Sequence, residues 1–87
     1  MANIEIYSKD WCPYCAKAKA LLKSKNLPYT DIDVTDDQEV QNIMIERSGR
    51  RTVPQIFIDG ELVGGYDDLA GLNASGELDR KLNHPAS

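Results

Sequence analysis

Residues 4–15 read IEIYSKDWCPYC, and this stretch decides the fold class. Ile4 and Ile6 alternate with polar neighbours, which is the period-two pattern of a half-buried strand. Pro13 suits the first position of a helix, because the backbone N–H that proline lacks would have no partner there. The stretch therefore predicts a strand that leads through a short loop into a helix, with Cys12 at the position that caps the helix.

The rest of the chain contains further strand and helix patterns, separated by turn residues. Apolar residues at helical spacing predict helices, and alternating or β-rich runs predict strands. In chain order the predicted elements are a strand around 4–6, a helix from 13 that stops near 26, a strand around 32–34, a helix after 35 that ends at 49, strands at 55–58 and 61–63, and a helix from 67 with a break near 75–76. Thr35 and Gln38 match a capping box for the second helix.

The order β-α-β-α-β-β-α predicts an α/β fold. The first two strands are expected to be parallel because a helix connects them, and Asp59-Gly60 favours an antiparallel hairpin between the last two. The result is a four-stranded mixed sheet with helices on both faces. We expect a single domain over residues 1–87, with a frayed tail at 83–87.

Length and composition restrict the class of protein further. A chain of 87 residues with a net charge of −4 is one small domain and is poorly suited to general binding of nucleic acid or anionic membranes. No apolar run reaches the ~18 to 20 residues of a membrane helix, and the first residues lack the features of a secretory signal. Two cysteines are too few for a disulfide scaffold. We therefore expect a cytoplasmic monomer.

The spacing Cys12-Pro13-Tyr14-Cys15 carries the most functional information. Cys12 at the helix cap would lie where unpaired backbone N–H groups and the helix dipole favour a thiolate, while Cys15 in the first turn would point toward the core. This asymmetry is what a reversible dithiol switch requires. A structural zinc site usually has four ligands, and this pair plus His84 falls short, so no metal site is expected. Incidental core cysteines would not favour proline between them.

Two more segments are candidates for ligand contacts. Thr52-Val53-Pro54 precedes a strand, and the residues leave two interpretations open: a cis proline that frees the Val53 backbone for a peptide-like ligand, or an ordinary strand-entry turn. The segment 64–68, Gly-Gly-Tyr-Asp-Asp, allows close backbone approach at a helix start. Its aspartates cap the helix, hold an ammonium group of a ligand, or do both. Trp11 is interpreted as a packing residue.

Taken together, these three motifs resemble those of the glutaredoxin family, specifically its small bacterial dithiol class with the sequence CPYC. The resemblance extends from Ile4 to Leu82. It implies a thioredoxin-like fold and glutathione-dependent thiol–disulfide exchange, with glutathione as a co-substrate and no tightly bound cofactor. The chain departs from many relatives at Tyr66, where they carry a cysteine.

The resemblance also assigns roles to residues, with Cys12 as the nucleophile and Cys15 as the resolving thiol. The other assignments all concern glutathione: its cysteinyl part would contact the backbone of Thr52, Val53 and a cis Pro54, its γ-glutamyl end would lie at Gly65, Asp67, Asp68 and the helix N-terminus, and its glycyl end would lie along Lys9, Tyr14 and Arg51 or its neighbour Arg50.

The partners implied by the resemblance are glutathione and disulfide-containing or glutathionylated proteins, with ribonucleotide reductase among those that the family serves. Two alternatives stay open. One is a redoxin of the same fold reduced by thioredoxin reductase, against which the aspartate pair Asp67-Asp68 favours glutathione. The other is an iron–sulfur carrier in which two chains share a cluster through Cys12 and bound glutathione. Pro13 stiffens the loop and disfavours that second alternative.

Overall fold

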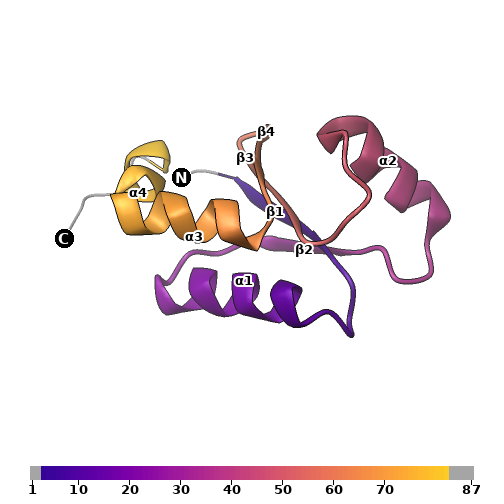
Figure 1. Cartoon of the computed structure of the whole chain (residues 1–87), viewed down its shortest axis with the longest axis horizontal. Coiled ribbons are helices and arrows are strands. Elements are labelled where there is room, and N and C mark those ends of the chain that lie inside the picture. Colours follow the sequence, from indigo (N-terminus) through magenta and orange to yellow (C-terminus); the bar gives the residue numbers. More distant parts are fainter. Residues whose placement is uncertain (1–2, 83–87) are drawn as a thin grey trace.

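The computed structural model describes residues 3–82, which form a four-stranded sheet and four helices (Figure 1). The elements in chain order are β1 (Ile4–Ser8), α1 (Pro13–Ser24), β2 (Thr30–Asp33), α2 (Gln38–Ser48), β3 (Gln55–Ile58), β4 (Glu61–Gly64), α3 (Tyr66–Ser75) and α4 (Glu77–Lys81). The predicted order is confirmed, including the break at Gly76 that separates α3 from α4. The tail expected at 83–87 lies outside the described residues.

The sheet is mixed, as predicted. Its strand order is β2-β1-β3-β4. The β1–β2 pair is parallel, while β1–β3 and β3–β4 are antiparallel. Asp59 and Gly60 both have positive φ, 52° and 82°, and they form the expected turn between β3 and β4.

Apolar side chains from the two faces of the sheet form two separate cores. Alternation in β1 places Ile6 on one face and Tyr7 on the other. The first core joins the sheet to α1, α3 and α4, and the second joins it to α2 (Figure 1). The buried members are Ile4, Ile6, Ala18, Leu22, Leu27, Ile56, Ile58, Leu69, Leu78 and Leu82 in the first core, and Tyr7, Val34, Met44 and Phe57 in the second. Helices therefore cover both faces, as predicted.

The start of α2 differs from the prediction. The N-cap is Asp37, whose Oδ1 accepts a hydrogen bond from the Val40 N–H at 3.1 Å. Thr35 is not the cap, because its hydroxyl is engaged by Asp33 and by the Asp10 carboxylate, to which it donates at 3.2 Å. The capping box of Thr35 and Gln38 is therefore wrong, since the threonine joins β2 to the loop after β1 instead.

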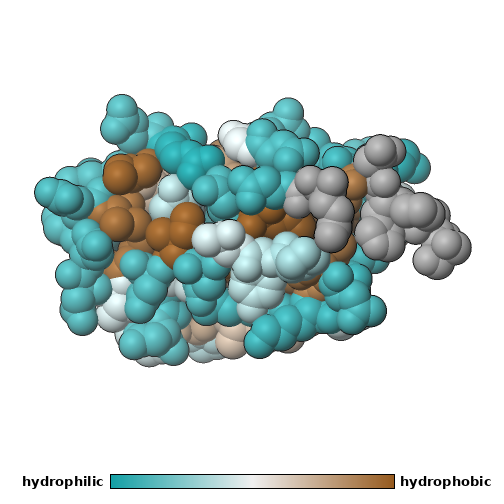
Figure 2. Space-filling view, turned by 180° about the vertical axis from the view of Figure 1, so that it is seen from behind, coloured by the Kyte–Doolittle hydropathy of each residue, from teal (hydrophilic) through white to brown (hydrophobic). Residues whose placement is uncertain are grey.

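The surface of the described residues is mostly hydrophilic. Seen from behind, it shows hydrophobic patches among hydrophilic side chains, including patches on the side where α2 lies (Figure 2). The large hydrophobic residues that are exposed are Trp11, Tyr14 and Ile43. No helix within residues 3–82 has the length and apolar character needed to cross a membrane.

Candidate active site

The sheet topology brings three loops to one edge of the molecule. Because β3 runs antiparallel to β1, its first residue lies beside the last residues of β1, where the chain enters α1. Because β4 runs antiparallel to β3, its end at Gly64 returns to the same edge. The loop that carries Cys12, the segment before Gln55 and the start of α3 therefore meet, although they are far apart in sequence.

Cys12 is the N-cap of α1, as predicted, and Pro13 is its first residue. The Cys12 Sγ accepts a hydrogen bond from the Cys15 N–H at 3.4 Å, which is the kind of backbone contact that stabilises a thiolate. The thiol also lies 3.8 Å from the carbonyl oxygen of Val53, to which it donates. The sulfur is half-buried and lies between the helix start and the segment that precedes β3.

Cys15 is the shielded member of the pair, with 1% of its surface exposed. Burial, followed by its hydrogen bond to Cys12, raises the pKa of the Cys15 thiol to about 12, and a backbone contact with Lys9 and then the charge of Lys19 oppose the shift. The pair thus combines an accessible sulfur with one that stays protonated at neutral pH, which is the asymmetry expected from the sequence.

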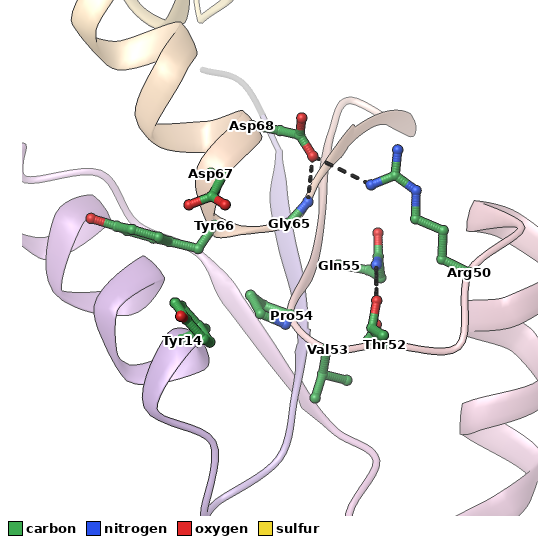
Figure 3. Close-up of a pocket in the computed structure, with 10 residues that line it drawn as sticks. All are labelled: Tyr14, Arg50, Thr52, Val53, Pro54, Gln55, Gly65, Tyr66, Asp67 and Asp68. Carbon is green, nitrogen blue, oxygen red and sulfur yellow. Dashed lines mark hydrogen bonds and ion pairs between the residues drawn. The ribbon is translucent and has the colours of Figure 1, made fainter.

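Val53, which the Cys12 thiol contacts, lines a cavity of about 340 Å³ (Figure 3). Its lining residues are Tyr14, Arg50, Thr52, Val53, Pro54, Gln55, Gly65, Tyr66, Asp67 and Asp68. The Val53–Pro54 peptide bond is cis, so the first of the two interpretations of this segment describes its backbone. Seven residues predicted from the sequence thus meet in one cavity: Tyr14, Thr52, Val53, Pro54, Gly65, Asp67 and Asp68.

Two predicted residues, Lys9 and Arg51, do not line this cavity, and Arg50 lines it in place of Arg51. Lys9 lies against the ring of Trp11, with its Nζ 5.5 Å from the ring centroid. Trp11 is 69% exposed, so its interpretation as a packing residue is wrong. Lys9 and Cys12 both line a second cavity, of about 260 Å³.

The two aspartates at the start of α3 are in different situations. Asp68 Oδ2 accepts hydrogen bonds from the Gly65 N–H at 3.0 Å and from Arg50 Nη1 at 3.3 Å, so it caps the helix and holds the guanidinium at the cavity (Figure 3). Among residues 3–82, the Asp67 carboxylate makes no hydrogen bond or ion pair. One carboxylate is therefore structural and the other is free to bind a cation.

Gln55 is a site residue that the sequence analysis missed. Its side chain is 1% exposed, and its Nε2 donates to the carbonyl oxygen of Thr52 at 3.0 Å and to Thr52 Oγ1 at 3.3 Å. Its Oε1 is buried without a hydrogen-bond partner among the described residues. A buried acceptor without a partner is costly, which makes this oxygen an exception among the buried polar side-chain atoms of the described residues. A polar residue inside an otherwise apolar strand was the available clue.

Tyr66 is also part of the site. Its ring centroid lies 6.4 Å from that of Tyr14, and Lys17 Nζ lies 5.3 Å from the Tyr14 centroid and 5.9 Å from the Tyr66 centroid. The two tyrosines and the lysine join the start of α3 to the first turn of α1. The two tyrosines line the cavity on its α1 side (Figure 3).

The arrangement as a whole suits thiol chemistry on a peptide-like ligand. A half-buried sulfur touches the Val53 carbonyl, and Val53 belongs to the cavity wall. The far part of the cavity carries both a guanidinium, from Arg50, and carboxylates, from Asp67 and Asp68. A ligand with its own ammonium and carboxylate groups would find opposite charges there.

Comparison with known proteins gives one family. The family model described as Glutaredoxin matches residues 4–63. Glutaredoxin 3 of Escherichia coli K12 is 53% identical over 82 residues, which covers 94% of this chain and 99% of that protein. The solution structure of a glutaredoxin from Brucella melitensis has a TM-score of 0.81 and 49% identity, covering 92% and 87% of the two chains. The crystal structure of a buckwheat glutaredoxin–glutathione complex has a TM-score of 0.86 and 28% identity, covering 94% and 77%.

Proposed function

The chain belongs to the glutaredoxin family and has its thioredoxin-like fold, and we propose that it is a glutathione-dependent oxidoreductase that reduces protein disulfides and glutathione mixed disulfides. Membership of the family supports thiol–disulfide oxidoreductase activity. The observation that carries the proposal is the position of the Cys12 Sγ, 3.8 Å from the Val53 carbonyl oxygen at the wall of the 340 Å³ cavity. A buckwheat relative solved with glutathione supports the choice of this tripeptide.

We infer how glutathione would lie in this cavity. The backbone of Val53 would pair with the cysteinyl residue, which would place its sulfur next to Cys12. The γ-glutamyl carboxylate would bind the N–H groups at the start of α3, and its ammonium would bind the free carboxylate of Asp67. Tyr14 would flank the glycyl end, and Lys9 and Arg51, which do not line this cavity, stay predictions for that end.

The chemistry proceeds in balanced exchange steps. The Cys12 thiolate attacks a glutathione mixed disulfide, takes up the glutathionyl group and expels the partner thiolate, which water protonates. The thiolate of a second glutathione then attacks the glutathionyl sulfur and releases Cys12 with glutathione disulfide as product. With a protein disulfide, Cys12 forms a mixed disulfide, Cys15 attacks Cys12, and the partner leaves as a dithiol. Two glutathione molecules reduce the resulting Cys12–Cys15 disulfide.

The energetics of these steps permit turnover in a reducing cell. Glutaredoxins have potentials of roughly −200 to −230 mV, close to the glutathione pool, so either direction is accessible. We propose that the protein acts as a monomer in the cytoplasm, with glutathionylated and disulfide-containing proteins as its substrates. Ribonucleotide reductase is one candidate among them.

Two serine variants test the roles of the thiols. Cys12→Ser is expected to reduce both activities to the uncatalysed background, because it removes the nucleophile. Cys15→Ser is expected to keep the reduction of glutathione mixed disulfides and to lose the reduction of protein disulfides. The measurement is a glutathione-coupled assay on a small mixed disulfide and on a protein disulfide. Appreciable turnover by Cys12→Ser, or equal loss of both activities in Cys15→Ser, would contradict the assignment.

The reductant is tested in the same assay. Wild-type protein is supplied either with glutathione and glutathione reductase or with thioredoxin reductase, each with its own nicotinamide donor. Turnover is expected only with the glutathione system. Efficient turnover with thioredoxin reductase alone would favour the redoxin alternative.

A further inference from the structure

We propose that the second cavity beside Cys12 docks an acidic segment of the protein whose disulfide Cys12 attacks. The inference rests on the proposed function and names the class of protein substrate for that site. The cavity has a volume of about 260 Å³ and is lined by Lys9, Asp10, Cys12, Ala16, Lys19, Ala20 and Lys23.

The position of the nucleophile separates this cavity from the one proposed for glutathione. Cys12 lines the second cavity and is absent from the lining of the first, which its thiol reaches only through the Val53 carbonyl. Cys12 is therefore close to both cavities, because it lines the second and its thiol contacts a residue that lines the first. The two cavities share no lining residue, so a protein segment in the second would leave the first for glutathione.

The second cavity extends from Cys12 along the axis of α1. Lys19 and Lys23 follow Cys12 along α1, and at a rise of 1.5 Å per residue they lie roughly 10 and 16 Å from it along the axis. Ala16 and Ala20 occupy the same side of the helix at four-residue spacing, and their small side chains leave room between the lysines. An extended segment at about 3.3 Å per residue would pass from the sulfur to Lys23 in about five residues.

The charges of the cavity select an acidic occupant. Three lysines line it against one aspartate, in a chain whose net charge is −4. Lys19 is partly satisfied by Asp31, at 2.7 Å. Within residues 3–82, Lys23 makes no ion pair, so its charge is free for a partner. A basic groove on an acidic protein attracts acidic segments and repels basic ones, which gives specificity as well as faster association.

Trp11 provides an apolar contact next to the groove. Its ring is 69% exposed and lies beside Lys9, immediately before Cys12 in the chain. Exposed tryptophans next to charged groups are frequent energetic centres of protein interfaces. The docked segment would thus contact Trp11 near its disulfide and the lysines of α1 further along.

The docked reaction is one exchange step followed by resolution. The Cys12 thiolate attacks one sulfur of the partner disulfide, and the other partner sulfur leaves as a thiolate that water protonates. The partner is then bound covalently through Cys12 until Cys15 attacks the Cys12 sulfur. The partner leaves fully reduced, and the two electrons come from the Cys12–Cys15 pair.

The test compares peptide disulfides of opposite charge in a single turnover. Pre-reduced protein is mixed with an internally disulfide-bonded peptide that carries glutamates next to its cysteines, or with the same peptide carrying lysines. The only tryptophan of the chain, Trp11, lies next to Cys12 and reports the reaction by fluorescence. Wild-type protein is expected to reduce the acidic peptide at least about tenfold faster at low salt, with the difference falling as salt rises.

A matched pair of double variants assigns the effect to the groove. Lys19→Ala/Lys23→Ala removes two charges from the groove, and Arg80→Ala/Lys81→Ala removes two from α4, where both residues make ion pairs. The groove variant is expected to lose about tenfold in rate on the acidic peptide and to be unchanged on the lysine peptide or faster. The α4 variant is expected to keep the preference of the wild type.

Several results would overturn the inference. These are equal rates on the two peptides, a groove variant that slows both peptides alike, and an α4 variant that loses the preference to the same extent. An increase in the KM for glutathione in the groove variant alone would assign the cavity to glutathione itself. Because single turnover needs no glutathione, failure of the glutathione-coupled assay with a retained preference for the acidic peptide would overturn the proposed function alone.

Discussion

The properties of single residues at this site depend on neighbours that are distant in sequence. Cys15 is protonated because the fold buries it, while Cys12, three residues earlier, lines one cavity and contacts Val53 at the wall of another. Arg50 contributes to the site because Asp68, from the start of α3, holds its guanidinium. The protonation state and the orientation of these side chains therefore depend on the residues that pack around them.

The pKa of Cys15 predicts a pH dependence of the resolving step. Burial raises the pKa of this thiol to about 12, so at neutral pH only a small fraction is thiolate, and that fraction grows about tenfold per pH unit. Once Cys12 is held in a mixed disulfide its own contribution disappears, but burial persists. The rate at which Cys15 releases a partner trapped on Cys12 is expected to rise steeply from pH 7 to pH 9. Rapid mixing with Trp11 fluorescence measures it, and a flat profile would contradict the prediction.

Gly64 is a residue at which only glycine fits. Its φ is +121°, and a Cβ there would collide with the Asp68 carboxylate and lie 3.1 Å from Arg50 Nη1. Gly64→Ala is expected to lower the free energy of unfolding by about 1 to 3 kcal/mol, through backbone strain and loss of the Asp68 cap. Urea unfolding measures this loss. Gly71→Ala, where nothing lies within 4 Å, is the control and is expected to be neutral or stabilising.

At the scale of elements, the ends of the helices position the chemistry. The α1 N-cap is the nucleophile, and the α3 N-cap is Gly65, whose N–H bonds Asp68. Cap residues are set by short local patterns, which is why Cys12 and Pro13 were predicted correctly. The start of α2 was predicted wrongly because several polar residues precede it, and each of them could cap the helix. The Thr35 hydroxyl instead donates a hydrogen bond to Asp10, which is distant in sequence.

The corrected cap of α2 is tested by substitution. Asp37→Ala removes the acceptor of the Val40 N–H and is expected to lower the free energy of unfolding by about 1 kcal/mol. Asp36→Ala changes the same charge one residue earlier, where the carboxylate makes no hydrogen bond within residues 3–82, and is expected to stay within about 0.5 kcal/mol of the wild type. Equal losses in the two variants would show that charge, not capping, matters here.

At the scale of the whole molecule, the two cores hold the three loops of the site at one edge of the sheet. Leu69, in the first core, has no exposed surface and fixes α3 against the sheet. Leu69→Ala is expected to lower the free energy of unfolding by about 2 to 5 kcal/mol, because it removes buried apolar surface and leaves a cavity. Ile43, which is 49% exposed on α2, serves as the control, and Ile43→Ala is expected to cost much less. Similar losses in both would contradict this account of the core.

The sequence by itself determined the order of elements, the mixed sheet, the hairpin turn and the asymmetric cysteine pair. These features follow from local sequence patterns: the spacing of apolar residues, the helix caps and the turn residues. Each of these depends only on neighbours a few positions away. Only the tertiary structure decided that Arg50 and not Arg51 lines the cavity, that Gln55 has a buried oxygen without a partner, and that a basic groove follows Cys12 along α1. The physical reason is that the direction of a loop side chain, and the surface opposite it, are set by packing between segments that meet only after folding.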